Sequence, residues 1–261
     1  MTNAVREPAM AWAAPRLRPG RLERGLERAI AVGYAVAYDA VVRGFAPYEA
    51  LLDDVAALVR ASGPGPLRVL DVACGTGTVA RRLAREGHAV VGLDPVEHLV
   101  RRAQRVRHSG VVFQHADMAA GTAFPAGSFD VCVSLHTINW HPRREALLAE
   151  CRRLLRPGGH AIVLSYTRPA AVRATFRDVR AQDGLGRAVS ALRWLVPTAV
   201  FEACRHYTPH YPDPTTLSRD LEAAGFAVRA SHPAFLAGIS RLVWARVAGD
   251  PAELHPTKET P

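Results

Sequence analysis

Lysine is almost absent from this 261-residue chain, in which Lys258 is the only lysine among 33 basic residues. The net charge of +9 therefore comes from arginine, a bias typical of a GC-rich genome. The arginines are scattered over segments that we predict to be solvated helix faces, and no compact basic run is interleaved with aromatic residues. A nucleic-acid partner, which the net charge alone would suggest, is therefore not predicted.

Cysteine is scarce, and long apolar runs are missing. The four cysteines stand far apart and form no C-x-x-C pair: Cys74, Cys132, Cys151 and Cys204. The histidines lack cysteine or carboxylate partners at ligand spacing, so no metal site is expected. No apolar h-region opens the chain, and the longest apolar stretch, 29–42, contains Asp39 and is too short to span a bilayer. These absences predict a soluble protein of a reducing, cytoplasmic compartment.

Composition divides the chain into four segments. Residues 1–20 are rich in proline and arginine and residues 248–261 are polar with three prolines, so both are predicted to be disordered tails. Two apolar-periodic lid helices are expected within 21–62, which ends where the chain-breaking sequence SGPGP begins. The remaining range, 63–247, fits one α/β domain. Its stretch 168–208 interrupts the strand pattern and is predicted to be an inserted helical cap.

Short apolar runs alternate with amphipathic segments through the main domain. The runs predicted as strands are LRVLDV (67–72), HAVVGLD (88–94), VVFQHAD (111–117), FDVCVSL (129–135), HAIVLSY (160–166) and SRLVWARV (240–247). An amphipathic helical stripe between the fourth and fifth runs, which includes Leu155, ends at RPGG. Asp213 and Pro214 are expected to begin a later helix. Apolar strands alternating with helices predict a doubly wound, mostly parallel sheet covered on both faces.

Acids and glycines follow the first three strands. Asp71 ends the first strand, and Gly75 and Gly77 come next in the stretch DVACGTGTVA, while Asp94 and Asp117 end the second and third runs. Ligands of open α/β sheets bind beyond the carboxyl ends of the strands, and glycines admit close approach of the backbone. Asp94, 19 residues after Gly75, is placed to accept both ribose hydroxyls. Taken alone, the glycine loop also fits a dinucleotide fingerprint.

These motifs resemble those of the class I S-adenosylmethionine-dependent methyltransferases, in particular the small-molecule group (methyltransferase type 11) that includes quinone C-methyltransferases. The resemblance covers about residues 30–247 and rests on VLDVACGTG, GLDP, HADM, FDVCVSLHTINW, ECRRLLRPGG and LEAAGFAV…GISRLVWAR. It implies a seven-stranded Rossmann-like methyltransferase fold with S-adenosyl-L-methionine as cofactor. This cofactor has no phosphate to seat on a helix N-terminus, and the third acid and LLRPGG belong to the methyltransferase pattern. Methyl transfer is therefore favoured over hydride transfer.

The resemblance also implies a set of cofactor-binding residues. Those expected around the methionine part are Asp71, Ala73, Gly75, Gly77, Ser134 and Leu135. Asp94 is expected to take the ribose with Pro95 beside it, while Asp117 faces the adenine amino group and Met118 packs on the ring. Ala73 departs from the family pattern, which more often has glycine there, although the quinone branch tolerates a methyl group.

The segment SLHTINWH follows the fourth strand, where the acceptor is expected. His136 is the candidate catalytic base and His141 the second candidate, with orientation of the loop as the alternative role for His136. Tyr38, one turn after Tyr34, is expected on a helix that closes over the cofactor. Aromatic residues that either line an apolar acceptor pocket or form the core of the cap are Trp140, Phe176, Trp194, Phe201, Tyr207 and Tyr211.

Other functions remain as alternatives. A nucleic-acid methyltransferase acting on exocyclic amines needs an N/D-P-P-Y/F-type loop after the fourth strand, and SLHTIN argues against it. A phospholipid N-methyltransferase would use the basic surface and an amphipathic N-terminal helix in weak contact with a membrane surface. A cyclase-type or structural protein that binds S-adenosylmethionine without methylating would carry the same motifs. The sequence favours O- or C-methylation of a small, apolar or aromatic acceptor, such as a quinone-like compound or secondary metabolite.

Overall fold

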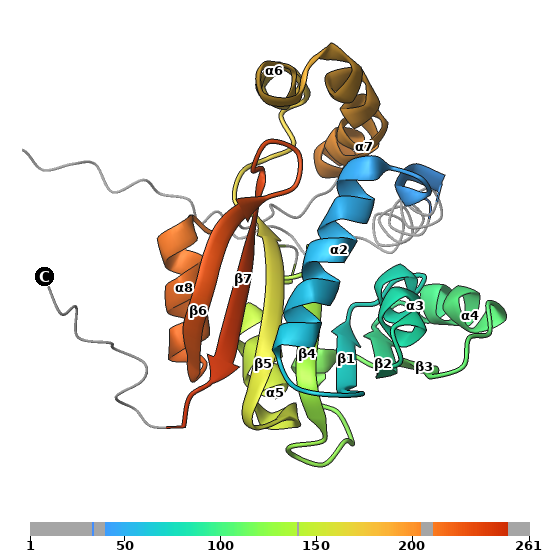
Figure 1. Cartoon of the computed structure of the whole chain (residues 1–261), viewed down its shortest axis with the longest axis vertical. Helices are drawn as coiled ribbons and strands as arrows, with labels where there is room; N and C mark the ends of the chain where they lie inside the picture. Colours follow the sequence, from blue (N-terminus) through green and yellow to red (C-terminus); the bar gives the residue numbers. More distant parts are fainter. Residues whose placement is uncertain (1–32, 34–39, 140, 205–210, 250–261) are drawn as a thin grey trace, which may run out of the picture.

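The computed structural model describes residue 33 and residues 40–139, 141–204 and 211–249 (Figure 1). The predicted tail 1–20, most of the predicted tail 248–261 and Tyr38 lie outside them. The helices are α2 (Ala46–Ala61), α3 (Thr78–Arg85), α4 (Glu97–Arg105), the 3-10 turn η1 (Met118–Ala120), α5 (Arg144–Leu154), α6 (Val172–Asp183), α7 (Leu185–Cys204) and α8 (Pro214–Ala223). The strands are β1 (Arg68–Val72), β2 (Ala89–Asp94), β3 (Val111–His115), β4 (Phe129–Leu135), β5 (Leu155–Tyr166), β6 (Phe226–Ala234) and β7 (Ser240–Val247).

The strands form one seven-stranded sheet in the order β3-β2-β1-β4-β5-β7-β6. The five strands from β3 to β5 are parallel, while β7 runs antiparallel to both of its neighbours. The order reverses between β1 and β4, so the chain winds first toward one edge and then toward the other. This arrangement confirms the predicted doubly wound, mostly parallel sheet.

Helices cover both faces of the sheet. Apolar residues of α2, α3 and α4 share one buried cluster with the sheet, and those of α5 and α8 share a second cluster on the opposite face. Figure 1 shows α2 in front of the strands and α5 and α8 behind them. The α8 helix begins as expected, because the Asp213 carboxylate accepts the backbone N–H groups of Thr215 and Thr216 at 2.9 Å each.

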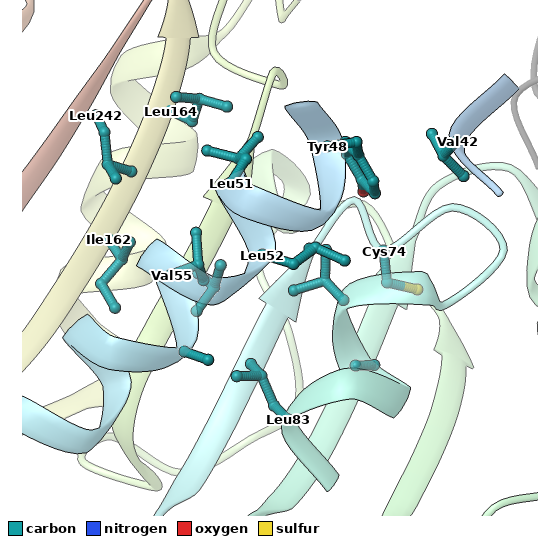
Figure 2. Close-up of a cluster of buried hydrophobic side chains, with 14 of the residues drawn as sticks. Val42, Tyr48, Leu51, Leu52, Val55, Cys74, Leu83, Ile162, Leu164 and Leu242 are labelled. Atoms are coloured by element: carbon teal, nitrogen blue, oxygen red, sulfur yellow. The ribbon is translucent and has the colours of Figure 1, made fainter. Parts of the chain in front are cut away.

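The α2 helix packs on the sheet through an apolar stripe at helical spacing. Leu51 and Val55 point toward Ile162 and Leu164 of β5 (Figure 2), and all four side chains are buried. Tyr48 lies one turn earlier on the same stripe and is 2% exposed. Burial of this stripe therefore fixes the position of Tyr48 at the end of α2 that lies near the carboxyl edge of the sheet.

Two strand assignments from the sequence were incomplete. The helix α5 ends at Leu154, and β5 begins at Leu155, five residues before the predicted strand. The RPGG sequence is therefore the start of β5, where Leu155 pairs with Phe129 and the register shifts before Val131. The segment that forms β6 was not predicted as a strand, because its alternation of apolar and polar residues is broken by a bulge between Val228 and Ala230.

The stretch predicted as a cap contains α6 and α7, which follow β5 and precede α8 in the chain. The two helices pack on each other. Both helices lie at the end of the molecule to which β5 leads (Figure 1). The Trp194 indole N–H donates a 2.8 Å hydrogen bond to the hydroxyl of Tyr166, the last residue of β5. The Arg193 guanidinium donates to the backbone oxygens of Ala40 and Arg43. The helix α7 is thus tied both to the sheet and to the segment before α2.

Candidate functional site

A cavity of about 350 Å³ lies at the carboxyl ends of the central strands, a size suited to a small-molecule site. The predicted site residues that line it are Asp71, Ala73, Gly75, Asp94, Pro95, Leu135, His136 and His141. They come from β1, β2, β4 and the loops that follow them. The cavity thus includes the point where the strand order reverses between β1 and β4, which is where ligands of open α/β sheets bind.

The loop after β1 forms one side of the cavity. Ala73 and Gly75 have φ angles of 54° and 56°, in the left-handed region that favours glycine. A Cβ atom on Gly75 would meet no atom within 4 Å, whereas one on Gly77 would overlap the Phe113 ring. Gly75 therefore leaves open space at the cavity. Gly77, outside the cavity lining, is instead needed for packing of the first turn of α3 against β3.

Asp94 joins the ends of two strands. Its Oδ2 accepts the backbone N–H of Gly75 at 2.9 Å and its Oδ1 accepts that of Val96 at 2.8 Å. The side chain is buried, and burial raises the pKa of Asp94 above its ordinary value. An ionised carboxylate has about four lone-pair sites, so each oxygen keeps acceptor capacity for a ligand. Asp94 is therefore an oriented acceptor at the wall of the cavity.

Asp71 connects the start of the glycine loop to the helix α3. Its Oδ2 accepts the backbone N–H of Ala80 in the first turn of α3 at 3.1 Å. Burial is the main reason that the pKa of Asp71 rises to about 7, and the nearby Asp94 carboxylate raises it further. The contact with α3 supports a role for Asp71 in ordering the loop. The carboxyl group also lines the cavity.

His136 is held rigidly at the end of β4. Its Nε2 shares a 2.8 Å hydrogen bond with Ser240 Oγ, and its backbone N–H donates to the oxygen of Leu164 at 2.7 Å. The ring stacks on Tyr166 with centroids 4.0 Å apart. Burial lowers the pKa of His136 to about 3, so the imidazole is neutral at physiological pH. These contacts favour the orienting role over that of a general base.

His141 and Asp117 lie together at a second side of the site. His141 Nε2 is 3.7 Å from Asp117 Oδ1 and its Nδ1 accepts the backbone N–H of Arg143. Burial lowers the pKa of His141. Asp117 accepts the Ala119 N–H at the start of η1 and a 2.6 Å hydrogen bond from the Arg143 guanidinium. His141 lines the cavity, whereas Asp117 does not.

Two further predicted residues, Met118 and Ser134, do not line the cavity, and three others lie outside the described residues. Met118 and Ser134 are both buried, and Met118 packs in the cluster on the α5 side of the sheet. Tyr38, Trp140 and Tyr207 lie outside the described residues. The roles expected for Tyr38, Trp140 and Tyr207 stay predictions.

Aromatic side chains from three distant segments form another part of the cavity lining, which we call the aromatic wall. Tyr48 of α2, Tyr166 of β5, and Trp194 and Phe201 of α7 all line the cavity. Tyr48 stacks on Trp194 with ring centroids 5.9 Å apart. The sequence identified Trp194 and Phe201 but missed the two tyrosines. Tyr166 carries the signal of a polar residue at a strand end, whereas Tyr48 resembles an ordinary member of a buried helical stripe.

Two more candidates from the cap have structural contacts. Phe176 packs at the edge of the cluster on the α2 side of the sheet. The Tyr211 hydroxyl donates a 2.8 Å hydrogen bond to Glu202. Neither residue lines the cavity. They therefore support the position of α7 from outside the pocket.

The distribution of charge divides the cavity into two halves. The carboxylates that line it, Asp71 and Asp94, lie on the side of the glycine loop, and no lysine or arginine lines it within the described part of the chain. The other half combines Leu135 with the aromatic wall. One half is therefore suited to a polar ligand with hydroxyl or amino groups, and the other to an uncharged planar one.

The sheet and its site define the class of Rossmann-like methyltransferase folds. An S-adenosylmethionine-dependent methyltransferase from Mesorhizobium loti has the same fold, with a TM-score of 0.53 and 24% identity over 75% of this chain and 99% of that one. The family described as Methyltransferase domain matches residues 70–163.

Curated relatives extend the match beyond the fold. A demethylmenaquinone methyltransferase of Thermus thermophilus is 35% identical over 177 residues, which are 63% of this chain and 76% of the relative. A ubiquinone biosynthesis O-methyltransferase of Agrobacterium fabrum is 30% identical over 62% of this chain and 60% of its own length. The chain spans 41% of the length of other curated relatives, which are 35% identical to it over 113 residues. The chain belongs to the class I S-adenosylmethionine-dependent methyltransferases, as the motifs predicted.

The described residues contain no group of three or more histidine, cysteine or acidic side chains placed to hold a metal ion. None of the described helices combines the length and hydropathy needed to cross a bilayer.

Proposed function

We propose that the protein transfers the methyl group of S-adenosylmethionine to oxygen or carbon of a small, uncharged aromatic acceptor. The observation that carries this proposal is the single cavity that joins the glycine loop and Asp94 to the aromatic wall of Tyr48, Tyr166 and Trp194. Cofactor and acceptor would lie end to end in this cavity. The names of the Thermus and Agrobacterium relatives support quinone-like acceptors.

The residues of the polar half fit the cofactor. Asp94 offers the spare lone pairs of a fixed carboxylate to the two ribose hydroxyls, and Gly75 leaves room where any side chain would project into the cavity. Val96 and Leu99 line the cavity beside Pro95 and would pack on the adenine ring. Asp71 holds the loop against α3. When bound, S-adenosylmethionine supplies a sulfonium methyl group that is already a strong electrophile.

The aromatic half would position the acceptor and exclude water. Tyr48, Tyr166 and Trp194 are each 2% exposed or less, so this wall is fixed before an acceptor enters. A fixed wall holds the acceptor atom in line with the methyl group, which lowers the entropic part of the barrier. The absence of a lysine or arginine in the described lining disfavours anionic acceptors.

The histidines restrict the chemistry of the acceptor. A general base works best with a pKa near the working pH, and burial lowers the pKa of both His136 and His141. The acceptor atom must therefore be acidic in itself, as in a phenol, a hydroquinone or an activated ring carbon. His136, fixed by Ser240, would orient such an acceptor rather than remove its proton.

Product analysis tests this function directly. The chain is incubated with S-adenosylmethionine and a panel of hydroquinones, phenols and matched benzoates. We expect methylated phenolic or hydroquinone product together with an equal amount of S-adenosylhomocysteine. Cofactor binding without either product across the panel would contradict methyl transfer and favour a cyclase-type or structural protein. Preferential methylation of benzoates at the carboxylate would contradict the assignment of an uncharged acceptor.

A further inference from the structure

The outward face of α7 is apolar. Four of its residues have large exposed fractions: Leu185 59%, Val189 54%, Val196 46% and Val200 58%. At 3.6 residues per turn these four positions fall within an arc of about 60° on the helix. They lie as two pairs along one face of the helix, with the half-buried Leu192 between the pairs, and we call this face the α7 stripe. An exposed apolar face of this kind marks a surface for a partner or a membrane.

The opposite side of the same helix belongs to the cavity. Trp194 and Phe201 lie roughly 130–150° from the middle of the α7 stripe around the helix axis, and both are buried and line the cavity. Only one helix thickness therefore separates the aromatic wall from the α7 stripe. Any surface that α7 contacts lies directly outside the half of the cavity assigned to the acceptor.

Exposed arginines also lie on the helix next to α7. On α6, which packs against α7, Arg173, Arg177 and Arg180 recur at helical spacing and are exposed, and the Arg177 side chain is 79% exposed. Both helices project at one end of the molecule (Figure 1). This end therefore combines an apolar stripe with an outward excess of positive charge.

We infer that α7 docks on an anionic lipid bilayer, with its stripe at the boundary of headgroups and acyl chains and the arginines of α6 among the phosphates. Interfacial helices bind membranes through this combination of apolar and basic surface. A second copy of the chain is a poorer partner, because two-fold pairing of this face would bring like charges together. Lipid binding by this face does not depend on the proposed function, whereas direct uptake of an apolar acceptor from the bilayer does.

Vesicle co-sedimentation tests the docking surface with the full chain. Vesicles of phosphatidylcholine alone are compared with a one-to-one mixture of phosphatidylcholine and phosphatidylglycerol, at low and high salt. We expect binding to the mixed vesicles that weakens with salt. The double variant Val189→Glu/Val196→Glu should lose at least about tenfold in binding. Glutamate is a good helix former, so α7 should persist, which circular dichroism checks.

Matched variants test whether a loss of vesicle binding is specific to the α7 stripe and the α6 arginines. Val112→Glu introduces the same change at a 54% exposed valine on the edge strand β3 and should leave binding unchanged. Arg173→Gln/Arg177→Gln/Arg180→Gln should weaken binding to the mixed vesicles about tenfold or more and reduce its salt dependence. Equal vesicle binding by the wild type and the α7 double variant would overturn the inference. So would light scattering that shows a dimer broken by that variant, with no vesicle binding by the wild type.

Calorimetric binding of S-adenosylhomocysteine to the same variants keeps the two proposals apart. We expect unchanged cofactor affinity in every surface variant, because none of these side chains lines the cavity. Vesicle binding without cofactor binding would contradict the proposed function and leave the docking surface standing. Cofactor binding without vesicle binding would contradict the docking surface and leave the proposed function standing.

Discussion

The backbone N–H of Gly75 donates a 2.9 Å hydrogen bond to the carboxylate of Asp94. This bond links the loop after β1 to the end of β2, so the glycine loop and its acidic partner form one unit at the wall of the cavity. The second oxygen of Asp94 is fixed by Val96. An acceptor that is oriented in advance binds ligand hydroxyls without the cost of ordering its own side chain.

Asp94→Ala should abolish useful cofactor affinity. Hydrogen bonds to a charged group contribute about 1.5–3 kcal/mol each, so loss of two ribose contacts predicts at least about a 100-fold weaker Kd for S-adenosylmethionine. Asp130→Ala is the matched control, because Asp130 also accepts a backbone N–H, that of Arg68, but stands at the start of β4, outside the cavity lining. Calorimetry should show unchanged affinity in the control. Wild-type affinity in Asp94→Ala would refute the assignment of the ribose site.

The two glycines of the loop should respond differently to alanine. Both have positive φ angles, so each substitution costs roughly 1 kcal/mol in backbone strain. Gly77→Ala also forces a methyl group into the Phe113 ring, which adds about 1–3 kcal/mol of overpacking. We expect Gly75→Ala to fold nearly normally but bind the cofactor at least about tenfold more weakly. Urea unfolding and calorimetry measure the two effects, and equal destabilisation of both variants would contradict this division.

Asp71→Asn should change how stability depends on pH. The folded-state pKa of about 7 lies above the ordinary value near 4, so wild-type stability from this group falls as pH rises from about 4 to 7. The asparagine variant lacks this titration but keeps an oxygen that accepts the Ala80 N–H. Its stability relative to wild type should therefore rise over that range, by at most about 4 kcal/mol. A difference that stays constant between those pH values would show that Asp71 titrates normally.

His136 variants distinguish a positioning residue from a base. His136→Gln keeps a polar group near Ser240, whereas His136→Ala removes it. With a pKa of about 3, His136 should produce no acidic limb in the kcat profile between about pH 5 and 9. We expect His136→Gln to retain most of kcat with the same profile and His136→Ala to raise KM for the acceptor. Loss of activity in both variants, with a wild-type acidic limb that disappears, would establish a base.

The depressed pKa of His136 has its own consequence for stability. The unfolded histidine binds a proton below about pH 6.5, while the folded one stays neutral until about pH 3. Stability from this residue is therefore lost as pH falls through that window. His136→Gln should show a shallower loss of stability with acid, and an unchanged slope would place the imidazole in a more solvated environment.

The bond between Trp194 and Tyr166 should couple α7 to β5. Trp194→Phe and Tyr166→Phe each remove the 2.8 Å hydrogen bond, which costs about 0.5–1.5 kcal/mol. The double variant loses the bond only once, so its destabilisation should be smaller than the sum by about 1 kcal/mol. Urea unfolding of the four proteins gives this difference. Strict additivity would mean that the contact does not contribute to the position of α7.

Strand ends explain why much of the site was accessible from the sequence. The positions of Asp71, Gly75, Asp94 and Leu135 follow from short apolar runs, because parallel strands bring their carboxyl ends to one edge. This argument does not identify Tyr48, because a helical stripe does not show which of its members lies at the edge of the core. The aromatic wall depends on how α2 and α7 pack over the sheet, and packing of distant elements leaves no local signal.

Local hydrogen bonds account for the residues whose surroundings differ from expectation. Asp117 looks like a third acid at a strand end, yet it accepts the Ala119 N–H at η1 and pairs with Arg143. A strand-end acid and a helix cap share the same sequence pattern, so only the partner distinguishes them. Gly77 likewise does not line the cavity, although its neighbours do, and serves packing against Phe113.

Calorimetric titration of the purified chain with S-adenosylmethionine, S-adenosylhomocysteine and NADH is the most direct test of the central claim. The cavity beside Asp94 predicts micromolar binding of the first two ligands and no binding of NADH. Binding of NADH without the other two would contradict a methyltransferase site and reassign the glycine loop to a dinucleotide.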